Sequence, residues 1–298
     1  MESADKNILT IGVSTRALFN LDVEHKIYET EGIESYIKYQ IDHEEELLEP
    51  GVAFNLIKSL SKLNERKEMA GKNIEIIIMS RSCPEVAIRT FNSIGHYGLN
   101  ISRAIFTGGN KLADFVKSNG VDLYLSSNEE DVKQVISHGI AAGLIHNNGI
   151  TYEQTEKEDV RIAFDCDKVL FSSESDDIFE KEGLDEYIKN EIQKKNVPVE
   201  PGPFKDLLIK LGKLQRLFEY DNSPIQVAIC TARNYPAHER VIKTFRSWGV
   251  RINQAFFLGG YDKGKALEAF NADIFFDDSE KNIIDGAKVV PACIVPQA

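Results

Sequence analysis

Cysteine is scarce in this chain, which has four cysteines among 298 residues. They lie far apart, with neither a CxxC pair nor the spacing of a zinc finger. The four are Cys83, Cys166, Cys230 and Cys293. This distribution excludes a disulfide-rich secreted domain and indicates free thiols in a reducing compartment, the cytoplasm.

Long hydrophobic runs are also missing. No apolar run approaches the ~20 residues that a membrane-spanning helix needs. The first residues, Met1 to Lys6, lack the charged and then apolar pattern of a secretory signal. We therefore expect that the protein does not have a membrane as a partner.

An excess of positive charge is absent as well, since 35 basic residues face 47 acidic ones and the formal net charge is −12. This balance argues against binding to a nucleic acid polymer or to an anionic membrane surface. A small anionic ligand stays compatible with it, because a metal ion and one or two lysines reverse the potential locally.

The chain contains an internal repeat. The pattern of Ile8–Phe19 recurs 151 residues later, as from Ile11 to Ile162, and the same displacement relates four further pairs of segments. These are Gly32 with Tyr36–Lys38 and Gly183 with Tyr187–Lys189, Glu49–Gly51 and Glu200–Gly202, Gly108–Gly109 and Gly259–Gly260, and Val121–Leu125 and Ala272–Phe276. One offset that recurs at five separated places indicates duplication.

Strands alternate with helices within each unit. Runs rich in β-branched residues, Ile74–Met79 and Ile225–Cys230, are typical of parallel strands buried on both faces. Apolar residues at helical spacing in Phe204–Leu214 and Val241–Trp248 predict amphipathic helices. The alternation predicts an α/β fold of two tandem Rossmann-like units with mainly parallel sheets.

We place the two units at residues 1–150 and 151–298, with the join in the polar stretch His146–Asp159. Residues 172–199 of the second unit form a charged connection between a strand and a helix, with helix-like spacing in Leu184–Ile192. A connection of this length is uncommon in a compact domain unless it has a function. We expect a small helical cap there, and an ordinary long connection is the alternative.

Two carboxylates, Asp165 and Asp167, follow the apolar strand Arg161–Phe164. The carboxyl ends of strands are where open α/β sheets hold their ligands. Two anions this close repel each other unless a cation lies between them, and hard oxygen ligands suit Mg²⁺. The alternative is a solvated Asp-x-Asp in a loop.

Three further segments of the second unit end predicted strands or follow them. Thr231 and Ala232 lie at a strand end, where a hydroxyl and the adjacent backbone N–H groups can bind phosphate. Lys263 lies in a loop with Lys265, and Asp277-Asp278 ends another apolar strand. Each segment alone is weak evidence, but their order is specific.

This order resembles that of the haloacid dehalogenase superfamily of phosphotransferases. A narrower resemblance, to the cytosolic 5′-nucleotidase type I family, rests on motifs in both units. They are Phe164–Ser172, Thr231–Arg233, Thr244–Gly249, Lys263–Gly264 and Phe275–Asp278 in the second unit, and Val13–Phe19 and Thr107–Asn110 in the first. The resemblance implies Mg²⁺-dependent hydrolysis of nucleoside 5′-monophosphates, with AMP preferred, across nearly the whole chain. One departure is Cys166, where a small residue, often Gly, is expected.

Under this resemblance each site residue receives a role. Asp165 is the nucleophile that forms an aspartyl-phosphate, and Asp167 is the acid and then the base. Thr231, Ala232 and Lys263 bind the phosphoryl oxygens. The expected Mg²⁺ ligands are Asp165, Asp167, Asp277 and Asp278.

The first unit lacks this chemistry. At the repeat offset, Ser14 stands for Asp165 and Leu112 for Lys263, and Ser126-Ser127 replaces the second carboxylate pair. We expect a degenerate unit that packs against the second one. The alternative is an effector site, in which Arg16 and Arg81 hold a phosphate.

The leaving group is the least constrained part of the prediction. Phe171, Phe179 and Tyr187 are candidates to stack on a base, and each is equally a core aromatic of the cap. Phosphatase activity on another small phosphomonoester is the nearest alternative, and a non-catalytic nucleotide sensor is another. The second is disfavoured by Asp167, because a sensor needs no general acid. A homo-oligomer is compatible with the sequence.

Overall fold

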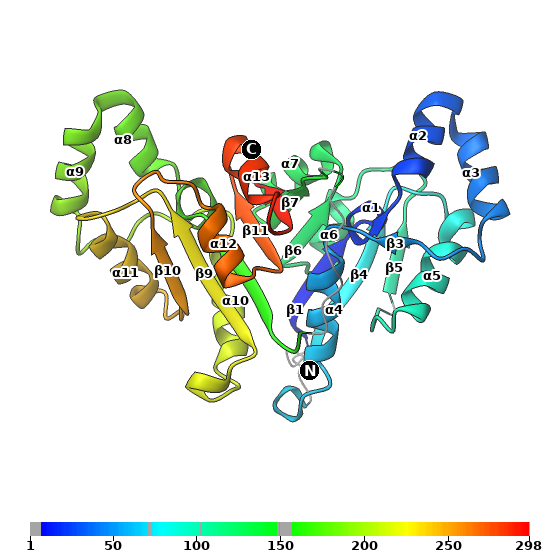
Figure 1. The fold of residues 1–298 in the computed structure, drawn as a ribbon, viewed down its shortest axis with the longest axis horizontal. Coiled ribbons are helices and arrows are strands. Elements are labelled where there is room, and N and C mark those ends of the chain that lie inside the picture. Colours follow the sequence, from blue (N-terminus) through cyan, green and yellow to red (C-terminus); the bar gives the residue numbers. More distant parts are fainter. Residues whose placement is uncertain (1–6, 71–72, 102, 148, 150–156, 298) are drawn as a thin grey trace.

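A ten-stranded sheet runs through the computed structural model of the protein, which describes residues 7–70, 73–101, 103–147, 149 and 157–297 (Figure 1). One side of the sheet has the strand order β5-β4-β1-β6-β7 and the other has β10-β9-β8-β11-β12. The first side consists of β1 (Asn7–Val13), β4 (Asn73–Ser80), β5 (Arg103–Phe106), β6 (Leu123–Ser126) and β7 (Ala141–Ile145). The second consists of β8 (Val160–Phe164), β9 (Ile225–Thr231), β10 (Gln254–Phe257), β11 (Ile274–Asp277) and β12 (Ala292–Ile294).

Neighbouring strands are parallel within each side, whereas β7 and β12 pair antiparallel at the centre, with Cys293 opposite Ile145. Gly143 of β7 lies at this seam, where a Cβ atom would approach Phe276 Cε1 at 2.8 Å and Cys293 Cβ at 2.9 Å. The sequence predicts a sheet for each unit. The structure instead joins the two halves in one sheet, because the edge strands β7 and β12 satisfy each other's backbone groups.

One face of the sheet carries a hydrophobic core that both halves share, since buried residues from Leu9 to Val295 form one cluster. The helices on this face are α4 (Phe54–Leu63), α5 (Ala87–His96), α10 (Lys205–Gln215) and α11 (His238–Ser247). Helix α4 packs against β8, and α10 packs against β1. Each of these two helices therefore contacts the first strand of the other half.

The opposite face carries a separate core in each half. Tyr124 and its neighbours pack under α6 (Ala113–Ser118) and α7 (Glu129–Ser137). Phe275 and its neighbours pack under α12 (Gly264–Phe270) and α13 (Glu280–Gly286). The sheet is therefore covered by helices on both faces, as expected for parallel strands.

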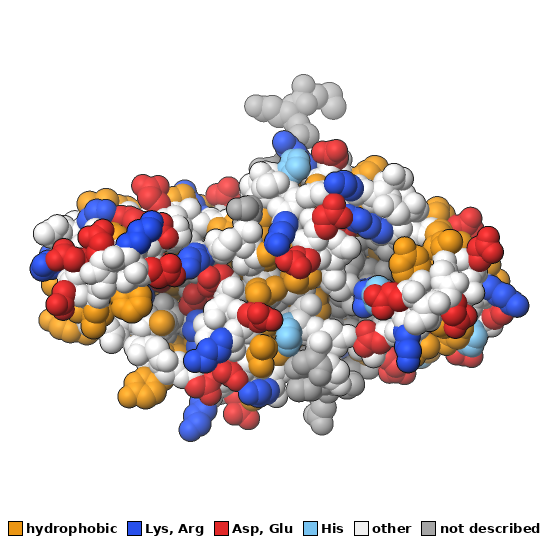
Figure 2. Space-filling view, turned by 90° about the horizontal axis from the view of Figure 1, so that it is seen from above, with side chains coloured by type: hydrophobic (Ala, Val, Ile, Leu, Met, Phe, Trp, Pro, Cys, Tyr) orange, Lys and Arg blue, Asp and Glu red, His pale blue; other side chains and the backbone are white. Residues whose placement is uncertain are grey.

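A pair of helices projects from each end of the molecule (Figure 1). Helices α8 (Glu174–Glu182) and α9 (Leu184–Gln193) lie within the expected cap at residues 172–199. The first half has an equivalent pair, α2 (Asp22–Glu31) and α3 (Ile33–Asp42), which the sequence analysis does not predict. Viewed from above, both pairs present hydrophobic side chains among charged ones (Figure 2).

The shorter elements lie between these parts. They are helix α1 (Thr15–Leu18), the helical turn η3 (Cys166–Leu170), strands β2 (Phe19–Asn20) and β3 (Glu49–Pro50), and the 3-10 turns η1 (Lys67–Met69), η2 (Pro84–Val86) and η4 (Tyr220–Asn222).

The repeated Glu-Pro-Gly segments pack against the chain that follows the first strand of each half. Strands β2 and β3 pair in the first half, and Phe171 pairs with Pro201 in the second. A Cβ atom on Gly202 would lie 2.3 Å from the Phe171 carbonyl oxygen, and one on Gly51 would lie 2.9 Å from that of Ala17. Close backbone approach therefore requires glycine at both positions.

The α/β class and the mainly parallel sheet are confirmed, and the expected strands and helices agree with the observed ones to within a few residues at their ends. The division into units at 1–150 and 151–298 stays a prediction, since most of its join lies outside the described residues. The N-terminal residues Met1–Lys6 also lie outside them. Within the part of the chain that is described, no helix has the length and apolar character needed to cross a membrane. All four cysteines are free thiols, as predicted.

Candidate active site

The carboxyl edge of β8, β9 and β11 brings together the polar residues that the sequence singles out. Asp165 follows β8 directly, Thr231 ends β9 and Asp277 ends β11. The backbone N–H of Asp165 donates to the carbonyl of Phe276 at 2.8 Å, which ties the ends of β8 and β11 together. The parallel register therefore fixes the backbone from which these side chains project.

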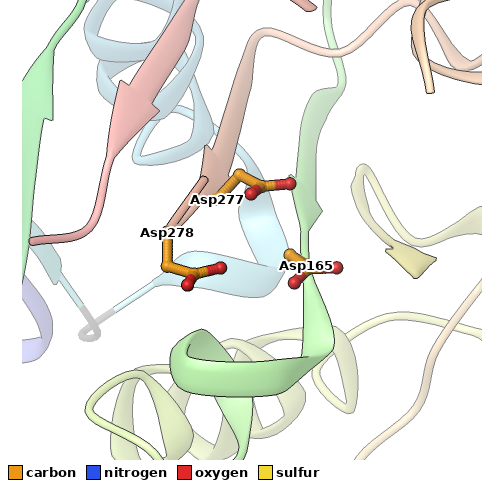
Figure 3. A group of neighbouring side chains, drawn as sticks. All are labelled: Asp165, Asp277 and Asp278. Carbon is orange, nitrogen blue, oxygen red and sulfur yellow. The ribbon is translucent and has the colours of Figure 1, made fainter. Parts of the chain in front are cut away.

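Three carboxylates form a cluster at this edge. Oxygen atoms of Asp165, Asp277 and Asp278 all lie within 4.8 Å of one another, and the side chains converge on a common space (Figure 3). Asp277 is fully buried, and its orientation is fixed by the Asn282 amide, which donates to both of its oxygens at 3.1 Å. The backbone N–H of Ser279 also donates to it at 2.8 Å. The cluster is therefore held in place by neutral donors and by the end of a buried strand.

Lys263 bridges two members of the cluster. Its Nζ lies 2.7 Å from Asp165 Oδ1 and 2.6 Å from Asp277 Oδ2. Burial alone would lower the pKa of this ammonium group, but Asp165 and Asp277 outweigh burial and raise the pKa. Lys263 therefore carries a positive charge next to the cluster, whereas the neighbouring Lys265 is exposed to solvent.

The cluster remains negative after Lys263 is counted, because three carboxylates face one ammonium group. Burial raises the pKa of Asp165 well above its usual value, and burial together with Asp277 raises the pKa of Asp278 to about 6. Both shifts indicate that positive charge is in short supply here. An all-oxygen donor set with excess negative charge fits a hard divalent cation such as Mg²⁺, with Asp165, Asp277 and Asp278 as ligands.

Asp167 does not belong to this cluster. Both of its oxygens accept from Arg233, at 2.8 Å from Nε and at 2.6 Å from one terminal nitrogen. The sequence prediction groups the Asp167 side chain with the metal ligands, but the structure turns it towards the guanidinium group. A bidentate arginine supplies both the positive charge and the hydrogen bonds that a buried carboxylate needs, so Asp167 faces Arg233 without a metal ion.

Arg233 also links the site to the cap, which the sequence analysis missed. Its other terminal nitrogen donates to Glu191 of α9 at 2.8 Å, and Arg240 of α11 donates to the same carboxylate at 2.9 Å. Arg240 reaches Glu174 of α8 at 3.0 Å as well. Arg233 is part of the Thr-Ala-Arg motif, but Glu191 lies in a charged helical stretch where nothing in the sequence marks it.

Lys168 is a second residue that the sequence analysis missed. It has a left-handed backbone conformation, with φ of 58°. Its Nζ lies 3.2 Å from Asp176 of α8 and 3.9 Å from Asp278. The lysine thus connects the acidic cluster to α8 of the cap through partly buried ion pairs, so we assign it a positioning role.

The expected phosphate-binding residues lie at the edge of the cluster. Thr231 is buried, and its hydroxyl oxygen accepts from the backbone N–H of Arg233 at 3.1 Å. This contact leaves the hydroxyl hydrogen free to donate to an anion. Ala232 is exposed at the start of the following turn.

The three aromatic candidates have different environments. Phe171 is fully buried and packs against Phe245 and Trp248, so its ring is part of the core and cannot stack on a base in this structure. Phe179 is 51% exposed on α8. Its ring meets that of the partly buried Tyr187 edge to face, with the ring centroids 6.1 Å apart. Only the last two remain as candidates for contact with a leaving group.

The fold and the site together define a class. A parallel α/β sheet that presents a carboxylate cluster and a bridging lysine at its carboxyl edge has the arrangement of a haloacid dehalogenase-like phosphotransferase. More narrowly, the chain belongs to the 5′-nucleotidase family, whose model, described as 5′-nucleotidase, matches residues 1–298.

The chain is similar to a human protein, "Cytosolic 5′-nucleotidase 1B", with 37% identity over 284 residues. The alignment covers 92% of this chain and 46% of the human protein, so the chain spans about half the length of that relative. Among solved structures, histidinol dehydrogenase from Elizabethkingia anophelis aligns over 98% of this chain and 55% of its own, with a TM-score of 0.22 and 11% identity. A similarity that low bears on neither the fold nor the function.

Proposed function

We propose that this chain is a Mg²⁺-dependent 5′-nucleotidase that hydrolyses nucleoside 5′-monophosphates, with AMP as its preferred substrate. Family membership and the name of the human relative support the activity class. One observation carries the proposal at the level of residues: Lys263 bridges Asp165 and Asp277 beside Asp278 at the end of the central strands. This geometry supports the proposed roles of Asp165 as nucleophile, Lys263 as phosphate-binding cation and the three carboxylates as metal ligands.

In the proposed first step, a carboxylate oxygen of Asp165 attacks phosphorus and the bond from phosphorus to the 5′-oxygen breaks. Asp167, two residues along the chain, gives its proton to the leaving oxygen. Lys263 and the Thr231 hydroxyl bind the oxygens on which negative charge develops. Bound Mg²⁺ would offset the repulsion between the anionic nucleophile and the anionic phosphate.

In the second step, Asp167 takes a proton from water, and the water oxygen attacks the phosphorus of the aspartyl-phosphate. The bond from phosphorus to Asp165 breaks, which releases phosphate and regenerates the carboxylate. Arg233 occupies both oxygens of Asp167 in this structure. The acid role therefore requires this ion pair to separate and Asp167 to take up a proton when substrate binds.

The base of the substrate is proposed to lie near Phe179 and Tyr187, which are the accessible aromatic residues of the cap. The free thiols and the name of the human relative favour a cytoplasmic location.

Phosphate release from AMP in the presence of Mg²⁺ tests the proposal. Excess EDTA is expected to stop turnover, added Mg²⁺ to restore it, and Ca²⁺ to fail as a substitute because it tolerates longer distances and more ligands. Full turnover in EDTA would contradict the metal-dependent mechanism.

A panel of mononucleotides and simple phosphomonoesters gives the substrate class. Faster phosphate release from a sugar phosphate than from any mononucleotide would refute the nucleotidase assignment. Binding of AMP without release of phosphate would identify a sensor.

A further inference from the structure

A cavity of about 470 Å³ lies in the first half, between the helical pair α2–α3 and the carboxyl ends of β1, β4 and β6. Its volume is within the range of small-molecule sites. The strand ends contribute Ser14, Ser80 and Ser126, and the helical pair contributes Tyr28 and Tyr36. The cavity therefore occupies the place in the first half that the candidate active site occupies in the second.

The repeat offset of 151 residues shows what has changed at this place. All four carboxylates of the second half are replaced by groups that bear no negative charge. Ser14 stands for Asp165, Arg16 for Asp167, Leu112 for Lys263, Ser126 for Asp277 and Ser127 for Asp278. The acidic site of the second half needs a metal ion to accept an anion. The equivalent positions of the first half carry no metal ligands and do not have this requirement.

The remaining charges of the cavity are mostly paired with each other. Arg81 donates to both oxygens of the buried Asp131, at 3.1 and 2.9 Å from Nε, and this hydrogen bonding raises the pKa of the arginine. Glu24 accepts from Arg89 at 2.5 Å. Arg81 is therefore not the phosphate ligand that its position in the sequence indicates, since Asp131 already neutralises it.

Arg16 is different. The nearest carboxylate recorded for its guanidinium group is that of Asp22, at 3.8 Å, which is an ion pair without a hydrogen bond. Its side chain is 32% exposed. Among the described residues of the cavity, Arg16 is therefore the arginine whose charge no hydrogen-bonded carboxylate neutralises.

Hydroxyl groups surround this charge. The Ser14 oxygen accepts from the backbone N–H of Ala17, so the Ser14 hydroxyl hydrogen stays free to donate. The Ser126 oxygen accepts from the backbone N–H of Asn128. The hydroxyl of Tyr124 is fully buried at the cavity wall, beside the hydroxyl of Ser126. These hydroxyl groups place hydrogen-bonding partners for an anion on the same cavity wall as Arg16.

The aromatic side of the site is retained where the acidic side is lost. Tyr28 and Tyr36 stand at the offset positions of Phe179 and Tyr187. Their rings meet at 6.0 Å and 80°, and the second-half pair meets at 6.1 Å and 83°. The two halves thus have the same aromatic geometry, next to a positive arginine in the first half and next to a negative carboxylate cluster in the second.

From these observations we infer that the first-half cavity binds a nucleoside phosphate without a metal ion and without hydrolysing it. Arg16 and the serine hydroxyls bind the phosphate, and Tyr28 and Tyr36 contact the nucleoside. The anion site follows from this cavity alone, whereas the nucleoside class rests on the proposed function of the second half.

The test uses the full chain carrying Asp165→Asn, in excess EDTA, so that neither turnover nor metal-dependent binding contributes. Calorimetric titration with AMP is expected to show binding to one site per chain. Arg16→Ala is expected to weaken this binding at least about tenfold, because a charge-assisted contact is lost. Arg103→Ala is the matched control, since it removes an arginine that pairs with Glu75 outside the cavity. Absence of binding at millimolar AMP, or equal affinity in the Arg16→Ala chain, would overturn the inference.

Ser127→Asp provides a second variant that does not depend on how the protein folds without Arg16. It places a carboxylate at the partly buried position of the first half that is equivalent to Asp278. AMP binding in EDTA is expected to be lost, and a gain of Mg²⁺ dependence would agree with the inference. Unchanged binding would contradict it. The melting temperature of each variant confirms that the chain is folded.

Inorganic phosphate as a second probe separates the anion from the nucleoside. Phosphate is expected to bind more weakly than AMP, and Tyr28→Ala is expected to weaken AMP binding but not phosphate binding. Equal affinity for both probes would refute the nucleoside class. Since none of these arms measures turnover, failure of the parent chain to release phosphate from AMP would refute the proposed function separately.

Discussion

The two halves of the molecule share their scaffold and differ in their charged groups. Both have five parallel strands in the same order, a projecting helical pair and an edge-to-face aromatic pair. The polar groups at the strand ends differ at almost every position. Apolar pattern therefore maintains the fold, whereas a handful of side chains at one edge of the sheet determines the chemistry.

The buried ion pairs that join each projecting helical pair to the rest of its half show the same contrast. In the first half, Arg89 meets one carboxylate, Glu24, and the neutral Gln40 at 3.2 Å. In the second half, Glu191 stands at the position of Gln40 and meets two arginines, Arg233 and Arg240. The additional ion pair is the one between Glu191 and Arg233, and Arg233 also pairs with Asp167. The cap of the second half is thus connected to the candidate active site, and the first-half pair is not connected in this way.

The largest expected effect comes from separating the halves. A fragment of residues 159–298 lacks β7, which pairs with β12. It also lacks β1 and α4, which contribute to the shared core. We expect it to aggregate, because an open strand edge and a large apolar face become exposed. Solubility and size-exclusion chromatography measure this. A soluble fragment with full activity would show that the first half is dispensable.

A smaller but still large effect is expected at the site itself. Asp165→Asn should reduce phosphate release from AMP by about a thousandfold or more, since an amide is no nucleophile. Ser14→Asn, at the equivalent position of the first half, is the matched control and should leave turnover within about twofold in the absence of added effector. Activity of the Asp165→Asn chain within tenfold of the parent would remove Asp165 from the nucleophile role.

The strands and core helices could be predicted from the sequence because their apolar periods are local. Ile225–Cys230 and Phe204–Leu214 each carry the pattern in consecutive residues, and β9 and α10 lie there. The continuous sheet could not be predicted, because β7 and β12 are short apolar segments whose pairing depends on the placement of both halves. The helical pair of the first half is not predicted for another reason: α2 and α3 are rich in polar residues and leave only two partly apolar faces in the sequence.

Within the candidate site, the strand-end residues could be predicted and the partners that hold them could not. Asp165, Lys263, Asp277 and Asp278 come together as expected, because parallel strands bring their ends to one edge. The Arg233 pairing of Asp167 depends on Glu191, which comes from a helix far along the chain. The burial of Phe171 depends likewise on α11 packing over it. Such contacts are tertiary and leave no local pattern.

The buried ion pairs give the third prediction. Glu191→Gln should lower the free energy of unfolding by about 3–5 kcal/mol, because it leaves two buried guanidinium groups short of one carboxylate. The equivalent change in the first half, Gln40→Ala, removes one hydrogen bond to Arg89 and should cost about 1–2 kcal/mol. Denaturant unfolding measures both. If Glu191 positions Arg233, Glu191→Gln should also lower kcat more than it changes KM, whereas equal stability losses at the two positions would contradict the contrast.

The smallest expected effect concerns Cys166, the residue between the two aspartates. Its side chain is fully buried and belongs to the shared core, and it supplies no ligand atom to the cluster of Asp165, Asp277 and Asp278. Cys166→Ala should therefore leave turnover within about twofold while removing about 1 kcal/mol of packing, which corresponds to a fall in melting temperature of about 2–4 °C. The equivalent Thr15→Ala in the first half should cost a similar amount, because the Thr15 hydroxyl contacts that of Ser80 at 3.1 Å. A tenfold loss of kcat in Cys166→Ala, with the melting temperature unchanged, would show that the residue between the aspartates takes part in the chemistry and that the halves differ at one more position than we infer.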